Sequence, residues 1–327
     1  MGKIKTYILK NRFLYNISRT IIDEISTIHL ECWIEKYKKN PEKVKEKLLK
    51  KGKFVSINKG KYNYKTFSAF YLNNMLALIL KNLLKGNIPI VNYTTSLTED
   101  KSNNWMDFFK QPIELKEIET QNYIIEKCNN CRFKPAFSVI YFKKKLKLWC
   151  YIYKEFIKLN DEMTNYIEEE YTNILKGKKV LGVICRGTDY ISTKPKYHPI
   201  QPNIEDVIKE AERLLNESKY QYIYLATEDE SYYKLFVSKF GHDKILTNKR
   251  TYYDKLYNEL DKSALLHSVN FERENDQYQK GKEYLSSIVL LSKCDAIIGG
   301  HCGGSDLALF FINCKYEYVH IYNCGTY

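Results

Sequence analysis

The feature that most constrains the fold is a regular alternation of strand-like and helix-like segments between residues 180 and 322. Short apolar runs alternate with longer segments such as 204–218, in which apolar residues recur with the spacing of an amphipathic helix. Strands separated by helices run parallel and need cover on both faces of their sheet. The expected strands are 180–185, 222–226, 244–246, 296–299 and 318–322. We therefore predict an α/β fold with a parallel sheet in this half of the chain.

The length of 327 residues suits two domains of about 150 residues each. Residues 141–175 read as helix throughout, and the Lys-Gly-Lys-Lys sequence at 176–179 breaks that pattern. We expect the boundary there, between a largely helical α/β N-terminal domain over residues 1–176 and a C-terminal domain over 177–327. In the first domain a helix is expected at 40–51, where Pro41 suits the first turn, and a buried strand at 89–91.

The positive charge is concentrated at one end of the chain. The formal net charge is +13, and residues 1–60 alone contain 15 Lys or Arg against 6 Asp or Glu. A basic nucleic-acid-binding protein is therefore an alternative, supported by 29 tyrosines that could stack on bases. The uneven charge and the lack of a recognised binding module argue against it, so no nucleic-acid partner is predicted. The basic N-terminal segment fits either peripheral membrane contact or a solvated helix face.

The apolar runs of the sequence bear on the localisation of the protein, and its cysteines bear on redox state and metal binding. No run of 18 apolar residues and no signal-peptide core is present, so we expect a cytoplasmic protein, with a peripheral location at the inner face of the cell membrane as the alternative. Nine cysteines, an odd number, indicate free thiols in a reducing compartment. The single C-x-x-C pair, Cys128 and Cys131, lacks a second ligand pair, so no metal site is predicted.

Polar clusters follow three of the expected strands at their carboxyl ends. They are Arg186, Thr188 and Asp189 after the first, Thr227, Glu228 and Asp229 after the second, and His301, Cys302, Gly303, Gly304 and Ser305 after the fourth. Parallel α/β sheets bind ligands at this edge. A glycine-rich turn that opens a helix offers N–H groups to an anion, and an arginine can fork onto phosphate oxygens. Each cluster alone has a structural explanation, but their convergence predicts a phosphate-bearing ligand. Neither the P-loop nor the dinucleotide fingerprint is present.

In order and spacing these motifs resemble those of the alpha-1,6-fucosyltransferase group, within a superfamily that has two facing Rossmann-like domains (the GT-B arrangement). The resemblance covers about residues 180–312. Residues 183–189 stand at the family's arginine–threonine–aspartate motif, 197–200 at its His-Pro-Ile segment, 224–229 at its Tyr-Leu-Ala-Thr-Asp-Asp motif, and 291–295 at its Leu-Ser-x-x-Asp strand lead-in. The chain also resembles transferases encoded with bacterial capsule and surface-polysaccharide genes.

The resemblance implies an inverting, metal-independent glycosyltransferase without a cofactor. It would move a fucose-like sugar from a nucleotide-diphosphate donor, GDP-linked in the family, to a glycan or lipid-linked glycan acceptor in surface-polysaccharide synthesis. The N-terminal domain would bind the acceptor and the C-terminal domain the donor. Arg186 matches the arginine that binds the donor's β-phosphate. The other predicted donor-binding residues are Thr188, His198, Thr227, Glu228, Asp229, Glu283, Ser287, His301, Cys302, Gly303, Gly304 and Ser305.

The chain also departs from the family pattern. Gly187 stands at a second motif arginine, and Ile184 at a histidine. The guanine-reading aspartate aligns with Ser287, and Glu283, one helical turn earlier, is a possible substitute. The family's proposed base aligns with Lys194, so we predict Asp189 as general base, with the alternative that it only orients Arg186. These losses leave a catalytically degenerate scaffold as another alternative.

Overall fold

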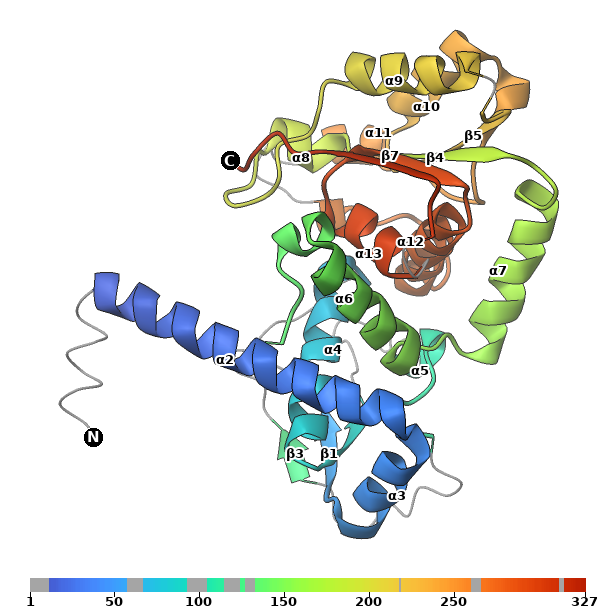
Figure 1. Cartoon of the computed structure of the whole chain (residues 1–327). Coiled ribbons are helices and arrows are strands. Elements are labelled where there is room, and N and C mark those ends of the chain that lie inside the picture. Colours follow the sequence, from blue (N-terminus) through green and yellow to red (C-terminus); the bar gives the residue numbers. More distant parts are fainter. Residues whose placement is uncertain are drawn as a thin grey trace. The chain divides into compact units, whose positions relative to one another are not determined.

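The computed structural model describes residues 12–57, 67–92, 105–114, 124–126, 133–217, 219–259, 266–311 and 315–327 (Figure 1). The chain divides into two compact units that interleave along the sequence. Unit 1 comprises Met1–Tyr62, Asn73–Tyr93 and Gln111–Ala136, and unit 2 comprises Asn63–Leu72, Thr94–Lys110 and Phe137–Tyr327. Residues 1–11 of the basic N-terminal segment and the Cys128–Cys131 pair lie outside the described residues.

Unit 1 is built on a three-stranded parallel sheet. Its strands are β1 (Phe54–Ile57), β2 (Ile88–Val91) and β3 (Ile124–Glu126), in the order β2-β1-β3. Helices α2 (Arg12–Lys39) and α3 (Pro41–Lys51) precede the sheet. Helix α4 (Ala69–Leu84) comes between β1 and β2 in the sequence, and its residues from Asn73 onward belong to unit 1. The side chain of Asn40 caps α3 by accepting from Lys43 N at 3.0 Å, with Pro41 in the first turn, as the sequence predicts.

Unit 2 contains a five-stranded parallel sheet in the order β6-β5-β4-β7-β8. The strands are β4 (Val180–Cys185), β5 (Tyr222–Thr227), β6 (Ile245–Leu246), β7 (Ala296–Gly300) and β8 (Tyr318–Tyr322), so all five predicted strands are confirmed. Its helices are α5 (Trp105–Phe108), η1 (Phe137–Tyr141), α6 (Lys143–Phe156), α7 (Asp161–Ile174), α8 (Thr188–Ser192), α9 (Ile204–Asn216), α10 (Glu230–Phe240), η2 (His242–Lys244), α11 (Asp254–Asn258), η3 (Leu266–Ser268), α12 (Asp276–Ser292) and α13 (Gly303–Phe311).

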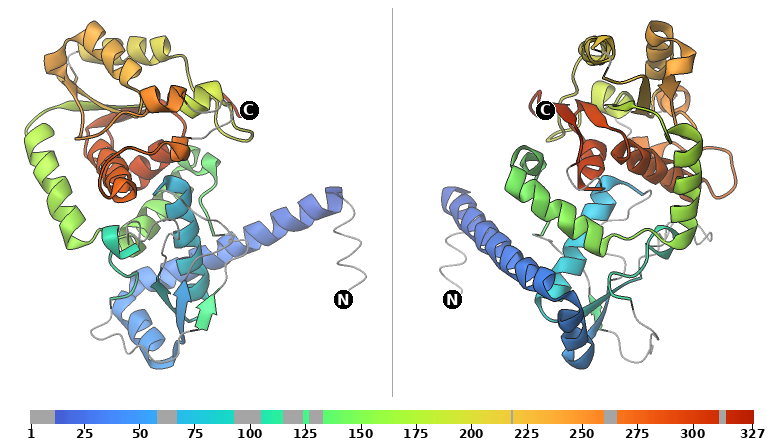
Figure 2. Two further views of the ribbon diagram at one scale, coloured as in Figure 1. Left: turned by 180° about the vertical axis from the view of Figure 1, so that it is seen from behind. Right: turned by 45° about the vertical axis from the view of Figure 1, so that its right-hand side comes forward.

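Helices cover both faces of the five-stranded sheet. Helices α9 and α10 lie on one face and α12 and α13 on the other (Figures 1 and 2). Every residue of β4 is buried, which explains why this central strand is a continuous apolar run. Val207, Ala211 and Leu214 of α9 pack into the core against β4, β5 and β7. The predicted α/β class, with a parallel sheet in each of two units, is confirmed.

The division of the chain differs from the predicted boundary at 176/177. Helices α6 and α7, expected in the N-terminal domain, belong to unit 2. The physical reason is packing, because α6 contacts α13 and α7 contacts α12. The Lys-Gly-Lys-Lys break at 176–179 therefore ends a helix within unit 2.

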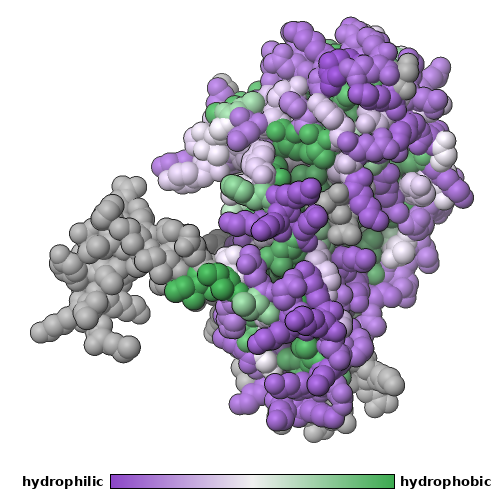
Figure 3. Space-filling view, viewed as in Figure 1, coloured by the Kyte–Doolittle hydropathy of each residue, from purple (hydrophilic) through white to green (hydrophobic). Residues whose placement is uncertain are grey.

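Two surface properties bear on possible partners. The face shown in Figure 3 carries mainly hydrophilic side chains with scattered apolar ones, a distribution that needs no special explanation. Among the described residues, no helix combines the length and apolar character that crossing a membrane requires.

Candidate functional site

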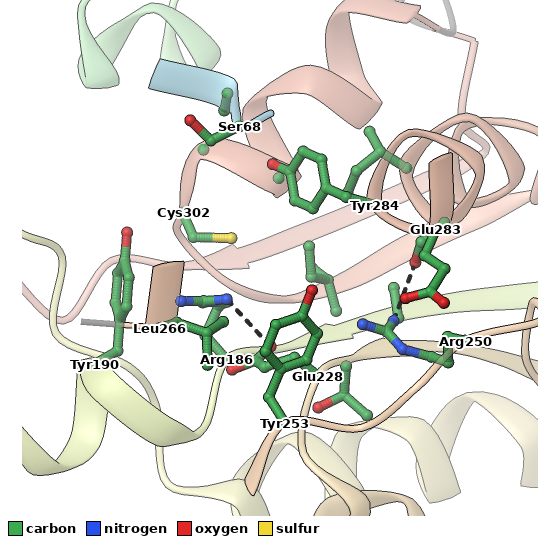
Figure 4. A pocket seen from close by; sticks show the side chains of 18 of the residues that line it. Ser68, Arg186, Tyr190, Glu228, Arg250, Tyr253, Leu266, Glu283, Tyr284 and Cys302 are labelled. Carbon is green, nitrogen blue, oxygen red and sulfur yellow. Dashed lines mark hydrogen bonds and ion pairs between the residues drawn. The ribbon is translucent and has the colours of Figure 1, made fainter. Parts of the chain in front are cut away.

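A cavity of about 200 Å³ lies at the carboxyl ends of β4, β5 and β7, and all of its lining residues belong to unit 2 (Figure 4). These three strands are direct neighbours in the sheet, so the polar clusters that follow them meet at one edge. The predicted site residues that line the cavity are Arg186, Thr227, Glu228, Glu283, Ser287, Cys302, Gly303 and Gly304. The predicted residues that do not line it are Thr188, Asp189, His198, Asp229, His301 and Ser305.

Arg186 follows β4 and lies between two buried carboxylates. Its Nη2 donates to Asp189 Oδ1 at 2.7 Å, and its Nη1 forms an ion pair with Glu228 Oε2 at 3.3 Å. The guanidinium carbon also lies 4.8 Å from the centre of the Tyr190 ring. Burial disfavours the charged guanidinium, but Glu228 and Asp189 outweigh it and raise the pKa of Arg186. The two carboxylates thus hold the guanidinium of Arg186 in one orientation. Those of its five N–H donors that do not contact the carboxylates can still donate to a ligand.

Glu228 holds the turn that joins β4 to α8. Its Oε1 accepts from Gly187 N at 3.0 Å and from Thr188 Oγ1 at 2.9 Å. Thr188 has a φ of 39°, a left-handed conformation that a β-branched residue rarely adopts. Such strain persists where the surroundings enforce it. Glu228 therefore fixes both the strained turn and the direction of Arg186.

Asp189 has both carboxylate oxygens engaged. Oδ1 accepts from Arg186, and Oδ2 accepts from Leu266 N at 3.1 Å. Its side chain is buried and does not line the cavity. This geometry suits the orienting role, and the use of Asp189 as a general base stays a prediction.

Asp229 caps α10 outside the cavity. Its Oδ1 accepts from Ser231 N at 2.9 Å, which satisfies a free N–H group of the first turn. The same carboxylate occupies the space beside Gly187, where an added Cβ atom would collide with it. A side chain at position 187, including an arginine, would therefore require Asp229 to move.

The glycine-rich turn after β7 leads directly into α13. Cys302, Gly303 and Gly304 line the cavity, and the first-turn N–H groups of α13 belong to this segment. Such N–H groups and the positive end of the helix dipole attract anions. Ser305 Oγ accepts from Cys302 N at 2.9 Å and so holds the turn. Burial raises the pKa of the Cys302 thiol, which keeps it neutral.

His301 and His198 support the surroundings of the cavity. His301 Nε2 lies 3.0 Å from Asp306 Oδ1, and both side chains are buried. Burial raises the pKa of Asp306, and the bond to His301 partly offsets that effect. The His198 ring packs edge-on against Tyr190, with 5.5 Å between ring centres.

Several lining residues were not predicted from the sequence: Tyr190, Arg250, Tyr253 and Tyr284. Arg250 and Tyr253 follow β6, so the rule that strand carboxyl ends carry the site could have found them. Tyr284 precedes the predicted Ser287 by one helical turn of α12. Among the described residues, no group of three or more His, Cys, Asp and Glu side chains is arranged to hold a metal ion.

No protein-family model matches the sequence, and no curated protein gives a significant match. The structure is similar to that of the NodZ alpha-1,6-fucosyltransferase soaked with GDP-fucose, with 13% identity, a TM-score of 0.45, and coverage of 80% of this chain and 93% of that chain. It is also similar to FUT1 of Arabidopsis thaliana in complex with GDP, with 10% identity, a TM-score of 0.47, and coverage of 89% and 78%.

A third similar structure is POFUT1 in complex with GDP, with 7% identity, a TM-score of 0.46, and coverage of 83% of this chain and 98% of that chain. All three are fucosyltransferases, the superfamily that the sequence motifs resemble. The identities are low and the TM-scores lie below 0.5, so the functional assignment depends on the cavity itself.

Proposed function

We propose that this protein is an inverting glycosyltransferase that uses a nucleoside-diphosphate sugar, with GDP as the nucleotide. The observation that carries the proposal is that Arg186 and the N-terminus of α13 line one cavity at the carboxyl ends of three adjacent parallel strands. A fixed guanidinium and the N–H groups of a helix N-terminus are elements that bind a diphosphate. The choice of GDP and of a fucose-like sugar depends on the motif resemblance.

The proposed reaction is a single displacement at the anomeric carbon of the donor sugar. An acceptor hydroxyl attacks that carbon, the bond to the diphosphate oxygen breaks, and the hydroxyl proton passes to a base. Negative charge grows on the leaving diphosphate, where the guanidinium of Arg186 and the first N–H groups of α13 would stabilise it. Asp189 and Glu228 would keep Arg186 in place for this role, since both pair with it.

The acceptor in this proposal is a glycan or lipid-linked glycan of a bacterial surface polysaccharide, made in the cytoplasm. Its support is the motif resemblance alone. Membrane contact through the basic N-terminal segment and acceptor binding by the N-terminal part of the chain remain predictions.

Binding and donor hydrolysis by the purified protein test the proposal. Thermal unfolding is followed with GDP, UDP, ADP, CDP and dTDP, because a ligand that binds only the folded state raises the apparent stability. We expect GDP to raise the unfolding temperature most and GDP-fucose to be hydrolysed slowly without an acceptor. Failure of every nucleotide to bind would refute the proposal. Tight GDP binding with no hydrolysis or transfer would favour the scaffold alternative.

Metal independence is tested by chelation. Arg186 and the α13 N–H groups supply the positive charge that a divalent ion supplies in other transferases. Donor hydrolysis should therefore continue at an unchanged rate after treatment with excess EDTA. Loss of activity on chelation, restored by added magnesium or manganese, would contradict this.

A further inference from the structure

Two arginines from different elements line the cavity, and among the described residues only Arg186 has carboxylate partners. Arg186 pairs with Asp189 and Glu228. Arg250, which follows β6, has no carboxylate within ion-pair distance among the described residues, and its Nε is buried without a hydrogen-bond partner there. Within the described part of the chain, its only hydrogen bond is a long one of 3.5 Å from Nη1 to Ser287 Oγ. A buried donor without a partner is costly, so Nε of Arg250 needs an acceptor from outside the chain, either a water molecule or a ligand.

Arg250 lies away from the end of the cavity where a diphosphate would bind. Figure 4 shows Arg186, Tyr190 and Cys302 on one side and Arg250 with Glu283 on the other, and the Tyr253 ring lies between the two arginines. Tyr253 and Glu283 both line the cavity, and burial, and after it the Glu283 carboxylate, raises the pKa of Tyr253. The Arg250 end therefore offers an aromatic face together with polar edge groups, the combination that binds a planar base.

Glu283 presents a carboxylate of fixed orientation at the same end. Arg273 holds it from outside the cavity, with Nη1 at 2.5 Å from Oε1 and Nη2 at 3.3 Å from Oε2. Arg273 is itself fixed by Asp276, whose Oδ1 accepts from its Nε at 2.8 Å. Each carboxylate oxygen retains accepting capacity. Glu283 can thus accept from two neighbouring N–H groups of a ligand, while Arg250 can donate to an adjacent carbonyl oxygen.

We propose that Arg250 determines the base specificity of the donor by donating to the O6 carbonyl of guanine, while Glu283, positioned by Arg273, accepts from the N1–H and 2-amino groups. Guanine alone among the common bases has a carbonyl oxygen beside two N–H donors along one edge. Adenine and cytosine have an amino group where guanine has O6, and uracil offers one N–H donor. This inference rests on the proposed function, because it assumes that the cavity binds a nucleoside diphosphate.

The test separates the base end of the cavity from the phosphate end. Calorimetric titrations of guanosine, pyrophosphate, GDP, ADP and UDP are made into the wild-type protein and into Arg250→Gln, Glu283→Gln and Arg186→Lys. Arg250→Gln and Glu283→Gln should each weaken guanosine and GDP by about 10- to 100-fold, the effect of losing a hydrogen bond to a charged group. Both should leave pyrophosphate binding unchanged, which also shows that the variants are folded.

Three further variants serve as controls for the Arg250 and Glu283 variants. Arg186→Lys should weaken pyrophosphate and GDP but not guanosine. Arg213→Gln is the matched control, because Arg213 lies on α9 and pairs with Glu210 outside the cavity, and it should bind every ligand as the wild type does. Arg250→Lys keeps the charge but not the planar fork, so it should recover only part of the guanosine affinity.

The outcomes distinguish this inference from the proposed function. Wild-type protein that binds ADP or UDP as tightly as GDP would overturn the inference while leaving the transferase proposal in place. Loss of pyrophosphate binding in Arg250→Gln with guanosine unaffected would make Arg250 a phosphate ligand and overturn it too. Wild-type protein that binds no nucleoside diphosphate would refute both proposals.

Discussion

At the scale of single residues, Arg186 has a structural role beside the chemical role proposed for it. The side chains of Asp189 and Glu228 are only 9% and 6% exposed, so each depends on the arginine for its counter-charge. Removing one partner from a buried ion pair leaves an uncompensated charge and is strongly destabilising. An arginine at this strand end therefore contributes to folding as well as to the proposed ligand binding.

The first prediction separates these two roles. Arg186→Ala should lower the free energy of unfolding by about 3 kcal/mol, because two buried carboxylates lose their cation. Arg186→Lys should keep most of the stability, since an ammonium still lies between them. Hydrolysis of GDP-fucose should fall by about 100-fold or more in both variants, because the fork that stabilises the leaving diphosphate is lost. Denaturant unfolding and donor hydrolysis measure the two effects, and near-normal turnover in folded Arg186→Lys would contradict the assignment.

At the scale of elements, the parallel strands were predictable because a buried central strand is a continuous apolar run. The sequence did not predict which side chain at a strand end lines the cavity. Glu228 and Asp229 are neighbours in the sequence, yet one lines the cavity and the other caps α10. Arg250 was missed because β6 has only two residues and the polar stretch after it has no periodicity. The direction of a side chain at a strand end depends on how the following turn packs, and the pattern of apolar and polar residues does not reveal that packing.

The second prediction concerns the turn from β7 into α13. A Cβ atom at Gly303 would lie 2.6 Å from the Cβ of Ala69, so Gly303→Ala should destabilise the protein by about 1–3 kcal/mol through overpacking. Ala69→Gly in the same chain should relieve that clash and recover most of the stability. If backbone at Gly303 also approaches the diphosphate, the double variant should still bind GDP more weakly than Ala69→Gly alone.

Calorimetric titration of guanosine into the same two proteins is the control for this prediction. Guanosine binding should be equal in both, because only the phosphates need the N–H groups of the turn. Equal losses of GDP and guanosine would show that the turn has a structural role alone.

At the scale of the whole molecule, the sequence predicted two α/β units but not how the chain divides between them. Residues 67–72 come early in the chain and nevertheless belong to unit 2, where Ser68, Ala69 and Phe70 line the cavity. A boundary drawn at a break in helical pattern cannot detect such interleaving, because unit membership depends on long-range packing. The cavity is therefore assembled from distant parts of the sequence within one unit.

This assembly predicts where a bound nucleotide stabilises the chain. At a GDP concentration 100 times the dissociation constant, binding raises the free energy of local unfolding by about 2.7 kcal/mol. This applies to every segment whose unfolding disrupts the nucleotide site. Hydrogen exchange followed by mass spectrometry, with and without GDP, should show slower exchange at the carboxyl ends of β4 and β5, in α12 and in the first turn of α13. Exchange in β1 and β2 should change little, because no cavity-lining residue belongs to unit 1. Adenosine diphosphate at the same concentration is the matched ligand control. Protection by GDP that appears in β1 and β2 but not around the cavity would place the nucleotide site in unit 1 and refute its location at the sheet edge of unit 2.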